Sequence, residues 1–164
     1  MGSTELHNGK VAVVGTGNIL MLDEGVGVHV IDQLRRKGVP PDVELFDAGV
    51  AIADVMDDLS QFDRVIIVDA TRGGEEPGAI YKYRLEDLNM EDFRNRHLTS
   101  AHEITLVETL MLNKLTDNLP EDILLIGVEP ARMEAGIGLS EILEGKMDAI
   151  VDVLMEEIAA AKRT

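Results

Sequence analysis

Three ionisable residues are spaced along the sequence in a way that suits a metal site. Glu24 follows a glycine-containing loop at residues 15–18, Asp69 follows an apolar run, and His102 lies near the start of a predicted helix. Near a helix N-terminus the macrodipole disfavours imidazolium and favours the neutral imidazole that binds metals. One imidazole and two carboxylates leave open coordination positions on a divalent ion such as nickel, zinc or iron. The residue types alone do not choose among these ions.

Each of the three also has a purely structural interpretation. The pair Asp23-Glu24 suits a helix start, where carboxylates cap free N–H groups and complement the dipole. Asp69 suits a turn or a helix cap, and a histidine placed like His102 is commonly a surface or capping residue. The functional interpretation gains weight because an α/β topology would bring the ends of the first and third strands to one rim of the sheet.

Other kinds of site are excluded by the residues present. The absence of cysteine excludes disulfides, thiolate zinc sites, iron–sulfur clusters and a cysteine nucleophile. Leu20 stands where a dinucleotide-binding fingerprint needs its third glycine, and there is no GxxxxGK[ST] loop. Leu106 replaces the second histidine of a zincin motif that would start at His102, and no serine lies in a GxSxG motif.

Short apolar runs that alternate with longer amphipathic stretches would position these residues. Runs at residues 11–14, 65–68 and 123–126 predict central strands covered on both faces, and residues 43–46 predict a less buried strand. Residues 79–85 alternate apolar and polar side chains, which is typical of an edge strand. Loop signals fill residues 71–78.

Apolar residues at helical spacing predict helices between these strands. The predicted helices span residues 26–34, 52–59 and 104–115, and a last one runs from about Lys146 to the basic tail. Ser100 and Glu103 form a capping box at the start of the third helix. We therefore expect an α/β fold with three layers, in which a mostly parallel twisted sheet of about five strands carries helices on both faces.

Length and charge restrict the domain organisation and the partners. The 164 residues suffice for one domain, which we expect to span residues 1–164 with residues 1–9 flexible. Acidic residues number 31 against 15 basic ones, and the net charge of -16 would repel nucleic acid and anionic membranes. The apolar runs are shorter than the ~18 residues of a membrane helix, and the first residues are polar, unlike a signal sequence. We expect a cytoplasmic protein with neither a nucleic-acid nor a membrane partner.

Residues 15–28, GTGNILMLDEGVGV, closely resemble the N-terminal signature of the nickel–iron hydrogenase maturation endopeptidases. The resemblance continues in the family's order through Val68-Asp69-Ala70, Pro77-Gly78, Ser100-Ala101-His102, Gly127-Val128-Glu129-Pro130 and Gly138-Leu139-Ser140. Those enzymes remove a C-terminal extension from the hydrogenase large-subunit precursor after nickel has been inserted. The resemblance implies that Glu24, Asp69 and His102 form the catalytic and nickel-recognition site, with roles not yet divided among them. It also implies that the precursor supplies the nickel.

Some alternatives stay open at this point. Val50 follows Gly49 where many members of that family have threonine, in a loop that helps shape specificity, so the hydrogenase that is processed is not identified. Cleavage could use water activated by Glu24 or Asp69 at a metal-polarised carbonyl, or nickel could only position the scissile bond. A non-catalytic nickel-binding or chaperone module would need the same three ligands. A nucleotide-binding domain is a third interpretation, supported only by the loop at residues 15–18.

Overall fold

The predicted α/β fold is confirmed in the computed structural model, which describes residues 9–89, 91 and 101–161, with the backbone alone for residues 101–105 and 161. Five strands form one sheet in the order β2-β1-β3-β5-β4. They are β1 (Val11–Thr16), β2 (Val43–Gly49), β3 (Arg64–Ala70), β4 (Ile80–Arg84) and β5 (Asp122–Val128). All neighbours are parallel except β4, which is antiparallel to β5.

The three runs predicted as central strands are β1, β3 and β5, and nearly all their residues are buried. The two less regular patterns are the edge strands: β4, as predicted, and β2, which the sequence predicts only to be less buried. An edge strand keeps one side away from the rest of the core, which is why its sequence mixes polar and apolar residues. The flexible N-terminal segment expected from the sequence lies almost wholly outside the described residues.

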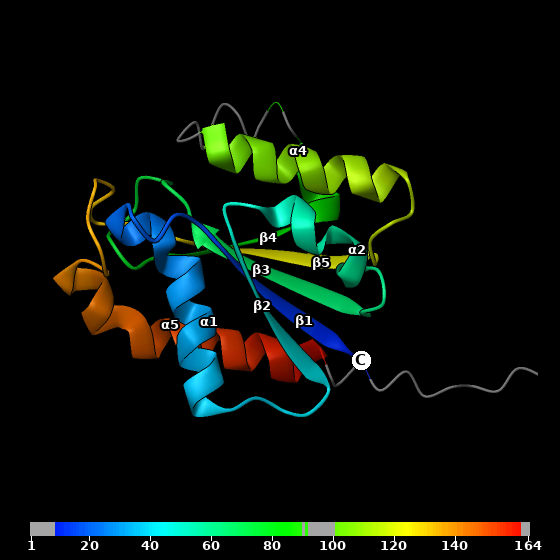
Figure 1. Ribbon diagram of the computed structural model, residues 1–164, viewed down its shortest axis with the longest axis horizontal. Coiled ribbons are helices and arrows are strands. Elements are labelled where there is room, and N and C mark those ends of the chain that lie inside the picture. The colour runs from blue at the N-terminus through cyan, green and yellow to red at the C-terminus, as the bar shows by residue number, and fades with distance from the viewer. Residues whose placement is uncertain (1–8, 90, 92–100, 162–164) are drawn as a thin grey trace, which may run out of the picture.

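Helices cover both faces of the sheet (Figure 1). The helical elements are the 3-10 turns η1 (Leu22–Gly25), η2 (Ile52–Val55) and η3 (Leu85–Asp87) and the helices α1 (Val26–Lys37), α2 (Met56–Leu59), α4 (Ala101–Leu115) and α5 (Glu141–Ala161). Helices α1 and α5 lie on one face, and α2 and α4 on the other (Figure 1). Among the described residues, no helix combines the length and the apolar character needed to cross a membrane.

Two predicted helices differ in detail from the structure. The predicted helix at residues 52–59 is a 3-10 turn followed by a single turn of α-helix. The last helix begins at Glu141 and not near Lys146, because the Ser140 hydroxyl accepts the Leu143 N–H at 3.3 Å and Leu143 is fully buried. Gly145 weakens the local helix signal, and the cap and the core contact overcome it. The capping residue Ser100 lies outside the described part of the chain.

The core consists of two apolar clusters, one on each face of the sheet. The cluster under α1 and α5 includes Val30, Ile31, Leu34, Ile66, Val68, Leu143, Ile150 and Leu154. The cluster under α2 and α4 includes Val14, Met56, Leu59, Val65, Ile67, Leu106, Val107 and Leu110. Side chains alternate between faces along a strand, so Asp69 falls on the same face as Ile67, toward α4.

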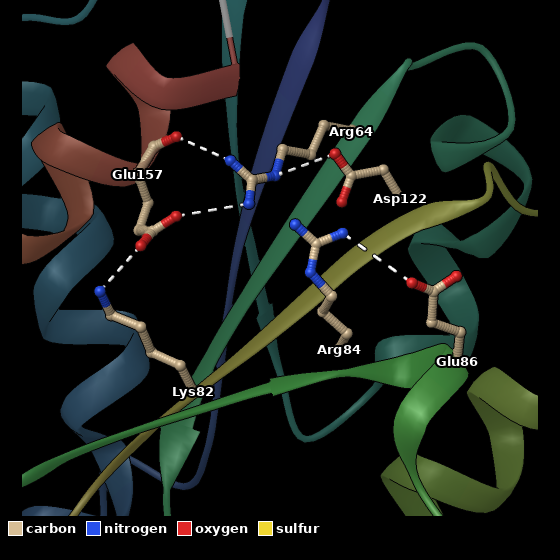
Figure 2. A network of polar contacts seen from close by, with 6 residues as sticks. All are labelled: Arg64, Lys82, Arg84, Glu86, Asp122 and Glu157. Carbon is tan, nitrogen blue, oxygen red and sulfur yellow. Dashed lines mark hydrogen bonds and ion pairs between the residues drawn. The ribbon is translucent and has the colours of Figure 1, made fainter. Parts of the chain in front are cut away.

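Buried Arg64 ties together the amino ends of two strands and the last helix (Figure 2). Its Nε atom lies 3.2 Å from a carboxylate oxygen of Asp122, and its two terminal nitrogens donate to the carbonyl oxygen and the carboxylate of Glu157 at 2.9 and 3.3 Å. Lys82 of β4 pairs with the other Glu157 oxygen at 2.8 Å. Burial opposes the charge of Glu157, but Lys82 and Arg64 outweigh it and lower the pKa of this carboxyl.

Candidate functional site

Glu24 and Asp69 lie at the switch point of the sheet. The chain leaves β1 through α1 to reach β2 on one side, and it returns through α2 to β3 on the other side. In open α/β sheets, ligands bind in the crevice outside the carboxyl ends of the two strands at such a point. Asp69 is the penultimate residue of β3, and Glu24 lies in η1, shortly after β1.

Asp69 is a buried carboxyl group, with 6% of its surface exposed. Its Oδ1 atom accepts the Ala70 N–H at 2.8 Å. Burial raises the pKa of Asp69 to about 7, the Glu24 charge contributes to the increase, and hydrogen bonds from Ala70 and Thr16 oppose it. Because Asp69 lies inside a strand, the turn and helix-cap interpretations are wrong. A carboxyl group with a pKa near neutrality can both accept and return a proton at physiological pH.

Close backbone packing places Glu24 at the end of β1. Gly17 has a φ of 128°, and a Cβ atom there would overlap the carbonyl oxygen of Glu24. A Cβ atom at Gly27 would overlap the carbonyl oxygen of Val68, so this glycine lets α1 start against the end of β3. Leu22 has a φ of 48°, a left-handed conformation that leucine rarely adopts. The glycines of residues 15–28 therefore serve close packing around the half-buried Glu24.

Asp23, next to Glu24, fastens a distant segment to this loop. Its carboxylate is fully buried and accepts the N–H groups of Ala131 and Arg132 at 2.9 and 2.8 Å, and the N–H and hydroxyl of Ser140 at 2.7 and 2.8 Å. The expectation that it caps a helix is wrong, because α1 has Gly25 as its N-cap residue and no side-chain cap. No local pattern marks the true role, since the partners lie more than 100 residues away along the chain.

His102 is the second residue of α4, within the first turn as predicted. Figure 1 shows this end of α4 at the same end of the sheet as the loop after β1. The side chain of His102 lies outside the described part of the structure. Among the described side chains, no three or more His, Asp or Glu residues are grouped so that they could hold a metal ion. The structure thus brings Glu24 close to Asp69, and the convergence of all three residues stays a prediction.

Comparisons with known proteins show what the whole chain is similar to. Residues 28–157 match the family model described as hydrogenase maturation protease. The chain is 32% identical to the hydrogenase 2 maturation protease of Escherichia coli (strain K12) over 156 residues, which cover 94% of this chain and 91% of that protein. The chain belongs to the hydrogenase maturation protease family. It is therefore a peptidase, and the resemblance seen in its sequence is confirmed.

Solved structures of such proteases share the fold. The hydrogenase maturating endopeptidase HybD from E. coli superposes with a TM-score of 0.75 at 31% identity, covering 94% of this chain and 92% of that one. A [NiFe] hydrogenase maturation protease HycI from Thermococcus kodakarensis KOD1 superposes with a TM-score of 0.72 at 23% identity, covering 90% of both chains. The second comparison supports the fold alone.

A further buried carboxylate of the protease, Glu129, shapes the loop beside Asp69. Its oxygens accept the N–H groups of Gly73 and Gly74 at 2.8 and 3.2 Å and the Tyr81 hydroxyl at 3.2 Å. A side chain at Gly73 would overlap the Tyr81 ring. The loop at residues 71–78, which the sequence predicts to be irregular, therefore has a fixed shape next to the end of β3. Sequence reasoning gave Glu129 no role, although an acid directly after a buried strand was a signal that could have been used.

Proposed function

We propose that this protease removes the C-terminal extension of a nickel–iron hydrogenase large-subunit precursor after nickel insertion, and that it recognises nickel carried by the precursor. The observation that carries the proposal is the buried Asp69 carboxyl, with its pKa raised to about 7 beside Glu24 at the switch point. Burying an acid in this way destabilises a protein, so such groups are concentrated at functional sites.

The ligand chemistry supports substrate-borne nickel. A cation close to Asp69 would favour its ionised form and offset the cost of burial. Glu24, Asp69 and His102 would hold a metal only in part, leaving positions for ligands from the precursor. The chain has no cysteine, so any thiolate ligand must come from the substrate. A site of this kind inspects the precursor for metal and does not store the metal between turnovers.

Beside such a cation Asp69 is ionised, and as a carboxylate it is the residue best suited to accept a proton during cleavage. A cavity of about 30 Å³ under α4 reaches this carboxyl group and is otherwise lined mainly by apolar residues such as Ile67, Leu106 and Leu125. That volume exceeds the roughly 10–15 Å³ that one water molecule needs. In the proposed reaction Asp69 accepts a proton from water as the water adds to the peptide carbonyl carbon. It then gives the proton to the leaving amine when the C–N bond breaks.

The direct test is incubation of the protein with a nickel-loaded large-subunit precursor, followed by mass measurement of both products. We expect one C-terminal peptide to be released from an otherwise intact large subunit. Tight binding of nickel without cleavage of any precursor would contradict the proposal and favour the nickel-chaperone alternative.

A further inference from the structure

Large aliphatic side chains are exposed on three loops that lie around Glu24. Ile19 and Leu20, after β1, are 46% and 59% exposed, Val50 after β2 is 64% exposed, and Ile137 before α5 is 87% exposed. We call these four residues the apolar rim. Single exposed aliphatic residues are ordinary, but a group of them on adjoining loops is typical of an interaction surface.

Backbone hydrogen bonds join the three loops to one another. The N–H of Gly17 donates to the carbonyl of Gly49 at 2.8 Å, next to Val50. The N–H of Gly136 donates to the carbonyl of Leu20 at 2.9 Å, and Leu22 donates back to Gly136 at 3.2 Å. The buried carboxylate of Asp23 adds the bonds to residues 131, 132 and 140 described above. The apolar rim is therefore held in place before any partner binds, which lowers the entropy lost on binding.

The stretches that directly carry the apolar rim contain no charged residue, although the loop of Ile137 also holds the exposed Arg132–Glu134 ion pair nearer β5. Residues 15–22, 48–53 and 135–140 contain no Asp, Glu, Lys or Arg, in a chain of which 28% is charged and whose net charge is -16. Charged residues are depleted in the same way at the centres of protein–protein interfaces. The four side chains of the apolar rim thus suit an apolar polypeptide segment.

We propose that the apolar rim is the docking surface for the precursor, and that it binds apolar side chains flanking the segment to be cleaved. This inference rests on the proposed function. The apolar rim adjoins Glu24 through η1 and lies at the same edge of the sheet as Asp69, so a polypeptide bound at the two carboxyl groups can contact it. Asp23 acts in this arrangement as a positioning residue, because its hydrogen bonds hold the loop of Ile137 against the loop of Leu20.

The test uses two variants that are matched in exposure. Ile137→Asp places a charge in the apolar rim, and Leu115→Asp places one at the far end of α4, where the side chain is 83% exposed. We expect Ile137→Asp to weaken binding of the nickel-loaded precursor about tenfold, as is common at the centre of an interface, and to raise KM with kcat unchanged. Leu115→Asp should leave both the dissociation constant and KM unchanged, and both variants should melt at the wild-type temperature.

Binding is measured separately from cleavage, so that failures of the two proposals can be told apart. If the wild type binds the precursor without cleaving it and Ile137→Asp weakens that binding, the docking surface stands and the proposed reaction falls. Equal binding by Ile137→Asp, Leu20→Asp and Leu115→Asp would overturn the docking surface. Sedimentation gives a second outcome that would overturn it. If the wild type is a dimer, and Ile137→Asp dissociates the dimer without changing precursor binding, the apolar rim contacts a second copy of this chain.

Discussion

At the scale of single residues, burial of the Asp69 carboxyl group lowers the stability of the fold at neutral and alkaline pH, although the proposed function needs this residue. Its pKa in the folded protein is about 7, against an ordinary value of 3.8. Between these two values the folded state keeps a proton that the unfolded state has lost, so the free energy of unfolding falls as pH rises through this range. The stabilising effect of the proton is complete below the ordinary pKa and is lost as pH rises through about 7.

Replacing Asp69 by asparagine should therefore stabilise the protein at alkaline pH. We expect Asp69→Asn to raise the free energy of unfolding at about pH 8 by up to roughly 4 kcal/mol, since each pKa unit corresponds to about 1.4 kcal/mol. The gain should shrink as pH falls and vanish below the ordinary pKa of 3.8, at about pH 3 or lower, where the wild-type carboxyl is protonated in both states. Urea unfolding of both proteins at the two pH values measures this, and a difference that does not change with pH would contradict the raised pKa.

Loss of processing should accompany the change of any one candidate site residue. We expect Glu24→Gln, Asp69→Asn and His102→Ala each to slow peptide release about a hundredfold or more, the range typical of lost acid–base groups, while circular dichroism shows a folded protein. Glu44→Gln, at an exposed position of β2, is the matched control and should process normally. An unfolded variant would show that the residue has a structural role, and normal processing by His102→Ala would remove His102 from the site.

The sequence predicts Glu24 and Asp69 as neighbours because their positions follow from the strands that precede them. Parallel strands end at one rim, so a carboxylate at each end is placed by topology alone. Asp23 and Glu129 were missed as structural centres because their bonds reach residues far away along the chain. A buried carboxylate that satisfies distant backbone N–H groups leaves no periodic pattern in the sequence.

At the scale of elements, Asp23 joins the loop after β1 to the start of α5. Asp23→Ala would leave the buried N–H groups of Ala131, Arg132 and Ser140 without their acceptor. Since each such loss costs about 1–3 kcal/mol, we expect a destabilisation of about 3 kcal/mol or more, measured by urea unfolding. Ser140→Ala removes only the hydroxyl and should cost about 1 kcal/mol. Similar losses for the two variants would show that the carboxylate is not the centre of this junction.

The Arg64 network at the other end of the sheet should affect stability without affecting processing. Because the pKa of Glu157 is lowered in the folded protein, its contribution is present above the ordinary carboxyl pKa and is lost as pH falls through the lowered value. We expect Glu157→Gln to cost about 1–3 kcal/mol near neutral pH and much less in acid, with unchanged processing. Asp32→Asn breaks only the exposed pair with Arg36 and should cost less than about 0.5 kcal/mol. Equal effects of the two variants would contradict this account.

Helices and strands could be predicted from the sequence wherever the spacing of apolar residues determines them. The three central strands follow from their apolar runs, since a strand covered on both faces needs an apolar residue at nearly every position, and β2 and β4 follow from mixed or alternating patterns. The start of α5 was misplaced because Ser140, which accepts the Leu143 N–H, is held in place by Asp23, and because Leu143 is buried by tertiary contacts. The strand order also needed the structure, since the patterns show which strands are buried and not which strands are neighbours.

At the scale of the whole molecule, the two ends of the sheet have different tasks. The Arg64 network stabilises the amino ends of β3 and β5, while the carboxyl ends carry the acidic pair, the fixed loops and the apolar rim. Variants of the Arg64 network should therefore change stability alone, whereas variants of the carboxyl end can change processing and, as at Asp23 and Asp69, stability as well. The buried Asp69 carboxyl group, whose burial destabilises the fold, therefore lies at the opposite end of the sheet from the ion pairs of Arg64.

The most direct test of the central claim compares cleavage of nickel-loaded and nickel-free precursor at equal protein concentrations, with the released C-terminal peptide followed by mass. The account predicts release from the nickel-loaded precursor alone, and no release from either precursor with Asp69→Asn. Adding nickel to the nickel-free precursor, and not to the protease, should restore cleavage. Equal cleavage of both precursors by the wild type would contradict the proposed function, because the protease would then recognise the precursor without its nickel.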